Sequence, residues 1–231
     1  MNPIILIGQG GNRTRLVIDI LKAMDLNQER LYLLKSSVPS NDCISLRKVN
    51  IHNLFNILDI IKEHKKFNFD ISNCDIDNKI LNILKKFKKL VLEEIANIKP
   101  KVIYFKEPRI RYLLPYFRII FRNMRIIYID RKNYSYMNHF ESNVNLYNNY
   151  FNSNKKYLTL KDKIKFSQSI KKHNINFLKK YNIDYCIINT DNLVNRKNYI
   201  NVINKLKKFM NIYKGNEQFI NKIESVIKFK I

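Results

Sequence analysis

Short apolar runs alternate along the chain with longer segments whose apolar residues recur every three or four positions. The short runs predict strands at residues 3–7, 29–35, 102–105, 125–129 and 185–188. The longer periodic segments predict helices at residues 14–24, 51–65, 78–98, 108–123, 160–181, 198–211 and 217–227. Because strands alternate with helices, we expect an α/β fold in which helices cover both faces of a parallel sheet.

The chain contains no internal repeat and no linker, so we expect residues 1–231 to form a single domain. The periodic pattern is weakest near residues 141–156, which are rich in asparagine and aromatic residues. We interpret this segment as a loop or a poorly regular helix. Its aromatic residues Tyr147, Tyr150 and Phe151 either pack inside the domain, which we favour, or form a lid over a substrate.

Glycine is scarce in this chain and concentrated in one turn. Only four glycines occur, and Gly8, Gly10 and Gly11 lie between the first predicted strand and the first predicted helix. Glycine lets the backbone turn tightly, and the N–H groups of such a turn, together with the helix N-terminus, attract an anion. The turn therefore predicts an anion-binding loop, with a tight turn that binds no ligand as the alternative.

The two commonest nucleotide-binding patterns do not fit this turn. Counted from Gly8, the phosphate-binding loop GxxxxGK[ST] would require glycine and lysine where Arg13 and Thr14 stand. The dinucleotide pattern GxGxxG would require a third glycine, also at Arg13. The cations that remain to support an anion here are Arg13 and Arg15. In the place of a glycine, Arg13 requires either a negative φ or backbone strain.

The overall charge also points to an anionic partner. Lysine and arginine number 43 against 19 aspartates and glutamates, which gives a net charge of +24. Such a charge favours a nucleotide, a nucleic acid, an anionic glycan or a membrane surface as partner, although an AT-rich genome also enriches lysine. The three cysteines are widely spaced and predict neither a disulfide framework nor a zinc site. No apolar run is long enough to span a membrane, so we expect a cytoplasmic protein, with peripheral membrane contact as an alternative.

Two further strand ends carry unusual chemistry. The strand at 102–105 is followed by Lys106-Glu107-Pro108-Arg109, and the strand at 125–129 by Asp130-Arg131-Lys132-Asn133. In open parallel sheets, ligands bind beyond the carboxyl ends of the strands. We therefore expect these two ends and the glycine turn to converge on one edge of the sheet. The arginines at 109, 111, 118 and 122 are expected on a solvated helix face, with Arg109 near enough to line the cleft.

These segments resemble motifs of the sulfotransferases, which use 3′-phosphoadenosine 5′-phosphosulfate. The turn is similar to their 5′-phosphosulfate loop, with matches at Gly10, Gly11, Thr14 and Arg15, Asn12 in the serine position and Arg13 in the last glycine position. The run from Lys106-Glu107-Pro108 to the strand that ends before Arg131 resembles the family's Lys-Glu-Pro segment, helix and strand. Residues 187–193 and 209–212 are similar to the family's "YEDL…FLGL" element.

The resemblance implies a P-loop NTPase-like fold and a role for each matching residue. Residues Gly10, Gly11, Asn12, Arg13, Thr14 and Arg15 would bind the 5′-phosphosulfate, and Arg131 the 3′-phosphate. His139 stands where the family has a serine on that phosphate. Lys106 would bridge to the sulfuryl oxygens and Glu107 would act as general base for an acceptor hydroxyl, which we expect on a carbohydrate or glycolipid. Sulfuryl transfer requires no metal.

Three alternatives remain open at this level. The substitutions Asn12, Arg13 and His139 are compatible with a divergent or inactive member of the family. A nucleotide kinase of related fold would need magnesium-dependent binding, and the missing P-loop lysine disfavours it. A nucleic-acid-binding protein without catalytic activity is supported only by the net charge, and no recognisable nucleic-acid-binding motif accompanies it.

Overall fold

The computed structural model describes residues 3–9, 12–24, 31–33, 78–96, 102–106, 108–134, 137, 144–212 and 217–227. Within these ranges, no helix is both long enough and apolar enough to cross a membrane. The helix predicted at 51–65 lies outside the described residues.

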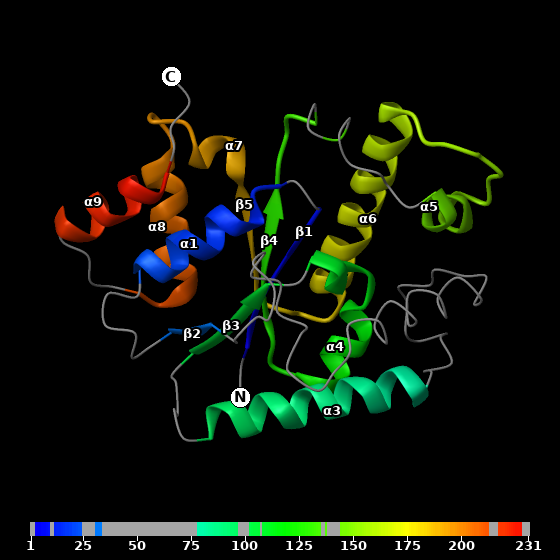
Figure 1. Cartoon of the computed structure of the whole chain (residues 1–231), viewed down its shortest axis with the longest axis horizontal. Coiled ribbons are helices and arrows are strands. Elements are labelled where there is room, and N and C mark those ends of the chain that lie inside the picture. The colour runs from blue at the N-terminus through cyan, green and yellow to red at the C-terminus, as the bar shows by residue number, and fades with distance from the viewer. Residues whose placement is uncertain are drawn as a thin grey trace.

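Five parallel strands form one sheet at the centre of the molecule (Figure 1). In chain order they are β1 (Ile4–Gly8), β2 (Leu31–Leu33), β3 (Val102–Lys106), β4 (Arg125–Asp130) and β5 (Tyr185–Asn189). Their order across the sheet is β2-β3-β1-β4-β5, and every neighbouring pair is parallel. The predicted α/β class and parallel sheet are confirmed, and β1, buried at all five residues, occupies the middle of the sheet.

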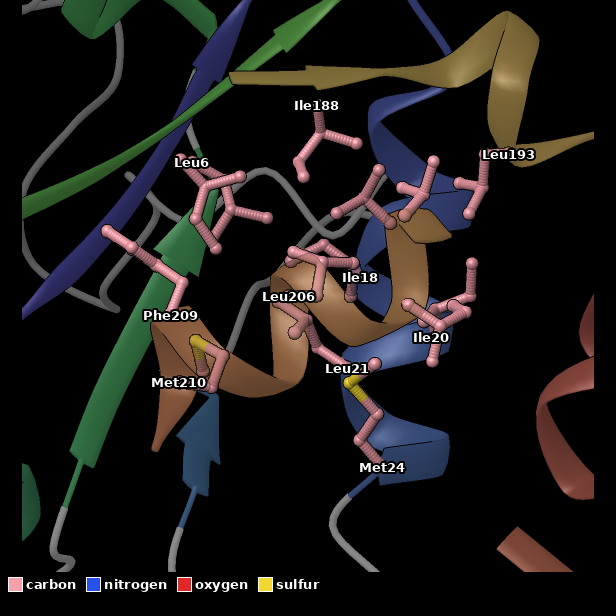
Figure 2. Close-up of a cluster of buried hydrophobic side chains, with 14 of the residues drawn as sticks. Leu6, Ile18, Ile20, Leu21, Met24, Ile188, Leu193, Leu206, Phe209 and Met210 are labelled. Carbon is pink, nitrogen blue, oxygen red and sulfur yellow. The ribbon is translucent and has the colours of Figure 1, made fainter. Parts of the chain in front are cut away.

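One face of the sheet is covered by α1 (Thr14–Met24), α8 (Tyr199–Met210) and α9 (Glu217–Val226) (Figure 1). Figure 2 shows Ile18 of α1 and Leu206 of α8 in the cluster that also contains Leu6 of β1. All three side chains are fully buried. Burying a side chain of this size stabilises the fold by about 1.5–3 kcal/mol relative to leaving it exposed.

The opposite face is covered by α3 (Asn78–Ile95), α4 (Leu114–Ile120) and α6 (Leu160–Lys180). Aromatic rings fill the space between these helices and the sheet. Phe87 of α3 meets Phe105 of β3 edge-to-face with ring centroids 5.8 Å apart, and Phe117 of α4 lies 6.2 Å from Phe87. Helices therefore cover both faces, as predicted, and α6 begins with a capping box between Thr159 and Asp162.

The helix predicted at 108–123 is two elements in the structure, the 3-10 helix η2 (Pro108–Tyr112) and α4. The break lies at Leu113, whose φ of −123° and ψ of 10° are not helical. Pro115 explains it, because proline has no N–H to donate to the carbonyl of Arg111 four residues earlier, and its ring clashes with that carbonyl in a continuous helix. Another difference is the short helix α7 (Thr190–Leu193) directly after β5, which the apolar pattern does not predict.

The asparagine-rich segment contains a regular helix, α5 (Val144–Phe151). The helix forms because its aromatic residues meet a ring on α6. The ring centroid of Tyr147 lies 6.0 Å from that of Phe166, and the centroid of Tyr150 lies 5.6 Å from it. Tyr147 is only 3% exposed. The aromatic residues of this segment thus pack, in agreement with the interpretation that we favoured.

Candidate functional site

The carboxyl ends of β3, β1 and β4 lie next to one another at one edge of the sheet, which is the upper edge in Figure 1. The three strands are parallel and adjacent, so the segments that follow them converge at this edge. The predicted convergence of the three strand ends is therefore confirmed. The end of β5 joins them from the far side of β4 and contributes α7.

The turn after β1 is packed tightly against the end of β4. A Cβ atom at Gly8 would collide with the backbone carbonyl of Ile129 and would lie 3.2 Å from the Cβ of that residue. Asn12, which is 3% exposed, donates from its side-chain amide to the same carbonyl at 3.0 Å. The backbone N–H of Asn12 also donates to the carbonyl of Gln9 at 3.1 Å. Asn12 thus holds the turn to the sheet through a buried hydrogen bond.

Arg13 adopts the left-handed backbone conformation that glycine ordinarily occupies. Its φ is 56°. Of the two alternatives given for this position, a negative φ or backbone strain, the structure therefore has the strained backbone. The Arg13 side chain donates to the carbonyl of Thr190 at 3.2 Å and approaches Asp191 at 3.5 Å. Burial, followed by the nearby charge of Arg131, lowers the pKa of Arg13, and Asp191 partly opposes this shift. The contacts to α7 compensate for the backbone strain.

Asp191 connects the two cations that the sequence analysis placed at opposite ends of one ligand. Its Oδ1 lies 3.5 Å from Arg13 Nη1 and 3.3 Å from Arg131 Nε. Its Oδ2 accepts from the backbone N–H groups of Lys132 and Asn133, both at 2.9 Å. Sequence analysis assigned no role to Asp191. The carboxylate fixes the loop after β4 relative to the turn after β1.

The other predicted residues fall into two groups. Thr14, the first residue of α1, is 7% exposed, Lys106 at the end of β3 is 2% exposed, and Arg15 is exposed. The second group, namely Gly10, Gly11, Glu107 and His139, lies outside the described residues. The roles that the sequence analysis assigns to these four residues therefore remain predictions.

Arg111 is a buried cation that the sequence analysis placed on a solvated face. The structure corrects that expectation, because Arg111 is only 6% exposed. Its guanidinium donates from Nη1 to the side-chain oxygen of Gln9 and from Nη2 to the hydroxyl of Tyr112. The guanidinium carbon also lies 4.5 Å from the centre of the Tyr112 ring. Arg111 therefore reaches the residue that begins the turn.

Polar groups continue beneath this cation, between β4 and α6. Burial raises the pKa of the Tyr128 hydroxyl, and Arg111 and the neighbouring amide of Asn174 oppose the rise. Asn174 is fully buried, yet neither atom of its amide has a partner in hydrogen-bonding geometry among the described residues. Asp130 at the end of β4 pairs with Lys171 of α6 at 2.5 Å. The described residues contain no cluster of three or more potential metal ligands.

A hollow of about 430 Å³ lies elsewhere, lined among the described residues by Arg118, Ile119 and Arg122. These residues end α4 and precede the start of β4, so the hollow belongs to the amino-terminal edge of the sheet. Arg118 stacks over the ring of Tyr181 at 4.2 Å. The hollow is therefore separate from the strand ends that carry the predicted site.

Comparisons with known proteins bear on the fold. No protein-family model matches the chain, and a search of curated proteins finds no match. Among solved structures, the chain is similar to a sulfotransferase domain from the curacin biosynthetic pathway. The two share 16% sequence identity with a TM-score of 0.52, and the match covers 96% of this chain and 78% of that chain. The chain therefore has a sulfotransferase-like α/β fold.

Proposed function

We propose that the chain is a sulfotransferase that moves a sulfuryl group from 3′-phosphoadenosine 5′-phosphosulfate to a hydroxyl group. The observation that carries the proposal is the linkage of Arg13 and Arg131 through Asp191. One arginine follows the anion-binding turn, and the other follows the strand that would bind the 3′-phosphate. Their common partner supports a single pocket with a cation at each end.

The chemistry of this edge suits a ligand with several negative charges. Four cations, Lys106, Arg111, Arg13 and Arg131, come from this edge of the sheet. Its described carboxylates are Asp191, which pairs with Arg13 and Arg131, and Asp130, which pairs with Lys171 on α6. Cations therefore outnumber carboxylates among the described residues of this edge. Gly8 has no side chain and lies close against β4, so the start of the turn presents only backbone groups. Both features fit a bound phosphosulfate.

Each residue has a distinct task in the proposed transfer. The backbone of residues 10–14 and Arg13 bind the phosphosulfate, Arg131 binds the 3′-phosphate, and Lys106 stabilises charge on the sulfuryl oxygens and the leaving phosphate. Glu107 accepts the proton of the acceptor hydroxyl. The acceptor oxygen then forms a bond to sulfur while the bond from sulfur to the phosphate oxygen breaks. The nucleotide leaves as adenosine 3′,5′-bisphosphate, and the residues named supply the transfer without a metal.

For the acceptor we propose a carbohydrate or a glycolipid. The net charge of +24 supports this proposal, because a basic surface attracts anionic glycans and anionic membrane surfaces through long-range electrostatics. Assays with radiolabelled sulfate donor and a panel of hydroxylated glycans would identify the acceptor class. Absence of transfer to every glycan and glycolipid, with transfer to another alcohol, would contradict this part of the proposal.

The nucleotide site is tested by isothermal titration with adenosine 3′,5′-bisphosphate. We expect the wild type to bind it, and Arg131→Ala to weaken binding about tenfold or more, because a hydrogen bond to a charged group contributes about 1.5–3 kcal/mol. Lys132→Ala is the matched control, since its side chain is exposed and only its backbone contacts Asp191. Its affinity should equal that of the wild type.

Two results would contradict the proposal. If ATP with magnesium binds while the bisphosphate does not, the kinase alternative is favoured. If neither nucleotide binds but DNA binds at physiological salt with a steep salt dependence, the nucleic-acid alternative is favoured.

A further inference from the structure

Arg111 stands out at the candidate site because it is buried and no described carboxylate pairs with it. Its exposed fraction is 6%, and its hydrogen bonds reach the neutral side chains of Gln9 and Tyr112. Among the described residues no aspartate or glutamate forms an ion pair with it. Removing a guanidinium from water is costly unless an opposite charge compensates for it.

The neighbouring acids are engaged elsewhere. Asp130 pairs with Lys171, and Asp191 is bound by Arg13 and Arg131. The nearby Tyr128 hydroxyl does not supply a negative charge either, because burial raises its pKa above the ordinary value. No described side chain around Arg111 therefore acts as its counter-ion.

The position of Arg111 points to the missing charge. Its helix, η2, packs against β1, and its guanidinium holds Gln9, the residue that follows Gly8. The flanking residues Ile110 and Leu113 belong to the core under α4 and α6, whereas α1 and Arg13 lie on the other face of the sheet. Cations therefore approach the end of β1 from both faces.

We propose that Arg111 is an anion-binding residue and that its counter-ion is the oxyanion held at the turn after β1. This inference deepens the proposed function, on which it rests for the identity of the ligand as a phosphosulfate. The chemistry that it requires is a tetrahedral oxyanion, either sulfate or phosphate. The buried guanidinium then provides charge and directed hydrogen bonds to oxygens over the carboxyl end of β1.

The charge of Arg111 is tested with two substitutions. Arg111→Gln removes the charge and keeps hydrogen-bond donors, whereas Arg111→Lys keeps the charge and loses the planar fork. Arg122→Gln is the matched control, because Arg122 is exposed and lies at the opposite edge of the sheet. Two probes are used. The effect of sodium sulfate on the unfolding temperature is compared with that of sodium chloride at equal ionic strength. The affinity for adenosine 3′,5′-bisphosphate is measured by isothermal titration.

We expect sulfate to raise the unfolding temperature of the wild type, of Arg122→Gln and, to a smaller extent, of Arg111→Lys. Sulfate also stabilises folded proteins in general, because it is excluded from their surface. Arg111→Gln should therefore keep that general effect, lose the additional response that saturates at low sulfate concentration, and bind the bisphosphate at least about tenfold more weakly. Without anion, Arg111→Gln should unfold at or above the wild-type temperature, because a buried unpaired charge has been removed. A purely structural role would instead lower the unfolding temperature and leave the sulfate response intact.

The outcomes separate this inference from the proposed function. If the wild type binds the bisphosphate and Arg111→Gln binds it equally well, the role of Arg111 is overturned and the proposed function stands. A second outcome is that the wild type does not bind the bisphosphate, and that only variants with a cation at position 111 respond to sulfate. In that case the anion site stands and the proposed function fails. No response of the wild type to either probe overturns both. If Arg111→Gln does not fold, Arg111→Lys decides: a sulfate response and a bisphosphate affinity equal to those of the wild type overturn the role of the guanidinium, and a reduction of both supports it.

Discussion

Arg13 and Arg131 meet at one carboxylate oxygen, Oδ1 of Asp191, at 3.5 and 3.3 Å. One arginine follows the first strand and the other follows the fourth strand of the chain. Each side chain is largely shielded from water, with exposed fractions of 22% and 11%. Two like charges lie close together only because a negative charge lies between them. The separation of the two arginines therefore depends on Asp191.

Asp191→Asn should destabilise the protein by about 1–3 kcal/mol, because it leaves two partly buried guanidinium groups without their counter-ion. The midpoint of urea-induced unfolding measures the change. Asp184→Asn is the control, since Asp184 pairs with Arg125 at 2.8 Å but is 60% exposed. An exposed pair contributes less than about 1 kcal/mol. Equal losses in the two variants would contradict the proposed importance of Asp191.

Arg13→Gly and Arg13→Ala separate backbone strain from side-chain contacts. Both variants lose the hydrogen bond to Thr190 and the ion pair with Asp191. Only glycine also relieves the cost of a φ of 56°. We expect Arg13→Gly to be more stable to urea than Arg13→Ala by about 1–2 kcal/mol. An alanine variant as stable as the glycine variant would show that the turn relaxes to a negative φ.

Gly8→Ala should weaken the contact between the turn and β4. The added methyl group would meet the backbone carbonyl of Ile129, which cannot move without disturbing the ladder between β1 and β4. Overpacking of this kind costs about 1–3 kcal/mol. Thermal unfolding measures the loss, and titration with adenosine 3′,5′-bisphosphate should show weaker binding. Ala substitution at Asn201, an exposed position of α8, is the control and should change neither value.

Asp162 should make stability depend on acidic pH. Lys155 at 2.5 Å, followed by Thr159, holds the pKa of its carboxyl well below the usual range. The ionised form therefore stabilises the folded state above the unfolded pKa of about 3.9, and this stability is lost as the pH falls through the lower folded value. Asp162→Asn should unfold more easily at neutral pH and lose less stability on acidification.

The measurement for Asp162 is the urea midpoint as a function of pH, between about pH 7 and pH 2. Asp19→Asn serves as a surface control, because Asp19 is 46% exposed and lies 4.0 Å from Lys22. Parallel pH curves for the wild type and Asp162→Asn would contradict the prediction.

Cys186 should be unreactive in the folded protein. Its side chain is 4% exposed, and burial raises its pKa to about 11. At about pH 8 the thiolate fraction is then on the order of one in a thousand, and thiolate is the reactive form. Iodoacetamide labelling followed by peptide mass spectrometry should detect modification of Cys186 only in denaturing urea. Rapid labelling of the native protein would contradict the burial described here.

Within the described residues, strands such as β1, β3 and β4 and helices such as α1 and α8 were predictable because their apolar patterns coincide with buried positions. The helix predicted at 14–24 has the bounds of α1, and all of β1 is buried, which explains its unbroken apolar run. The prediction for 108–123 was wrong in one respect, which concerns the position of Arg111. The break at Leu113 changes the helical phase, so that Arg111 points inward although its spacing from Arg118 suggests a common exposed face.

Much of the site depends on contacts that no local pattern encodes. The short helix α7 forms because Asn189 accepts from the backbone N–H of Asp191 at 2.9 Å, and four residues are too few for a visible apolar period. Sequence motifs indicated Arg13 and Arg131 separately. Only the order of β1, β4 and β5 in the sheet shows that Asp191 lies between them.

Because α7 lies at the margin of the sheet, the C-terminal third of the chain sets the gap between two cations that belong to earlier segments. If the proposed anion site is correct, substitutions in α7 will change its affinity although α7 itself supplies no ligand to the anion.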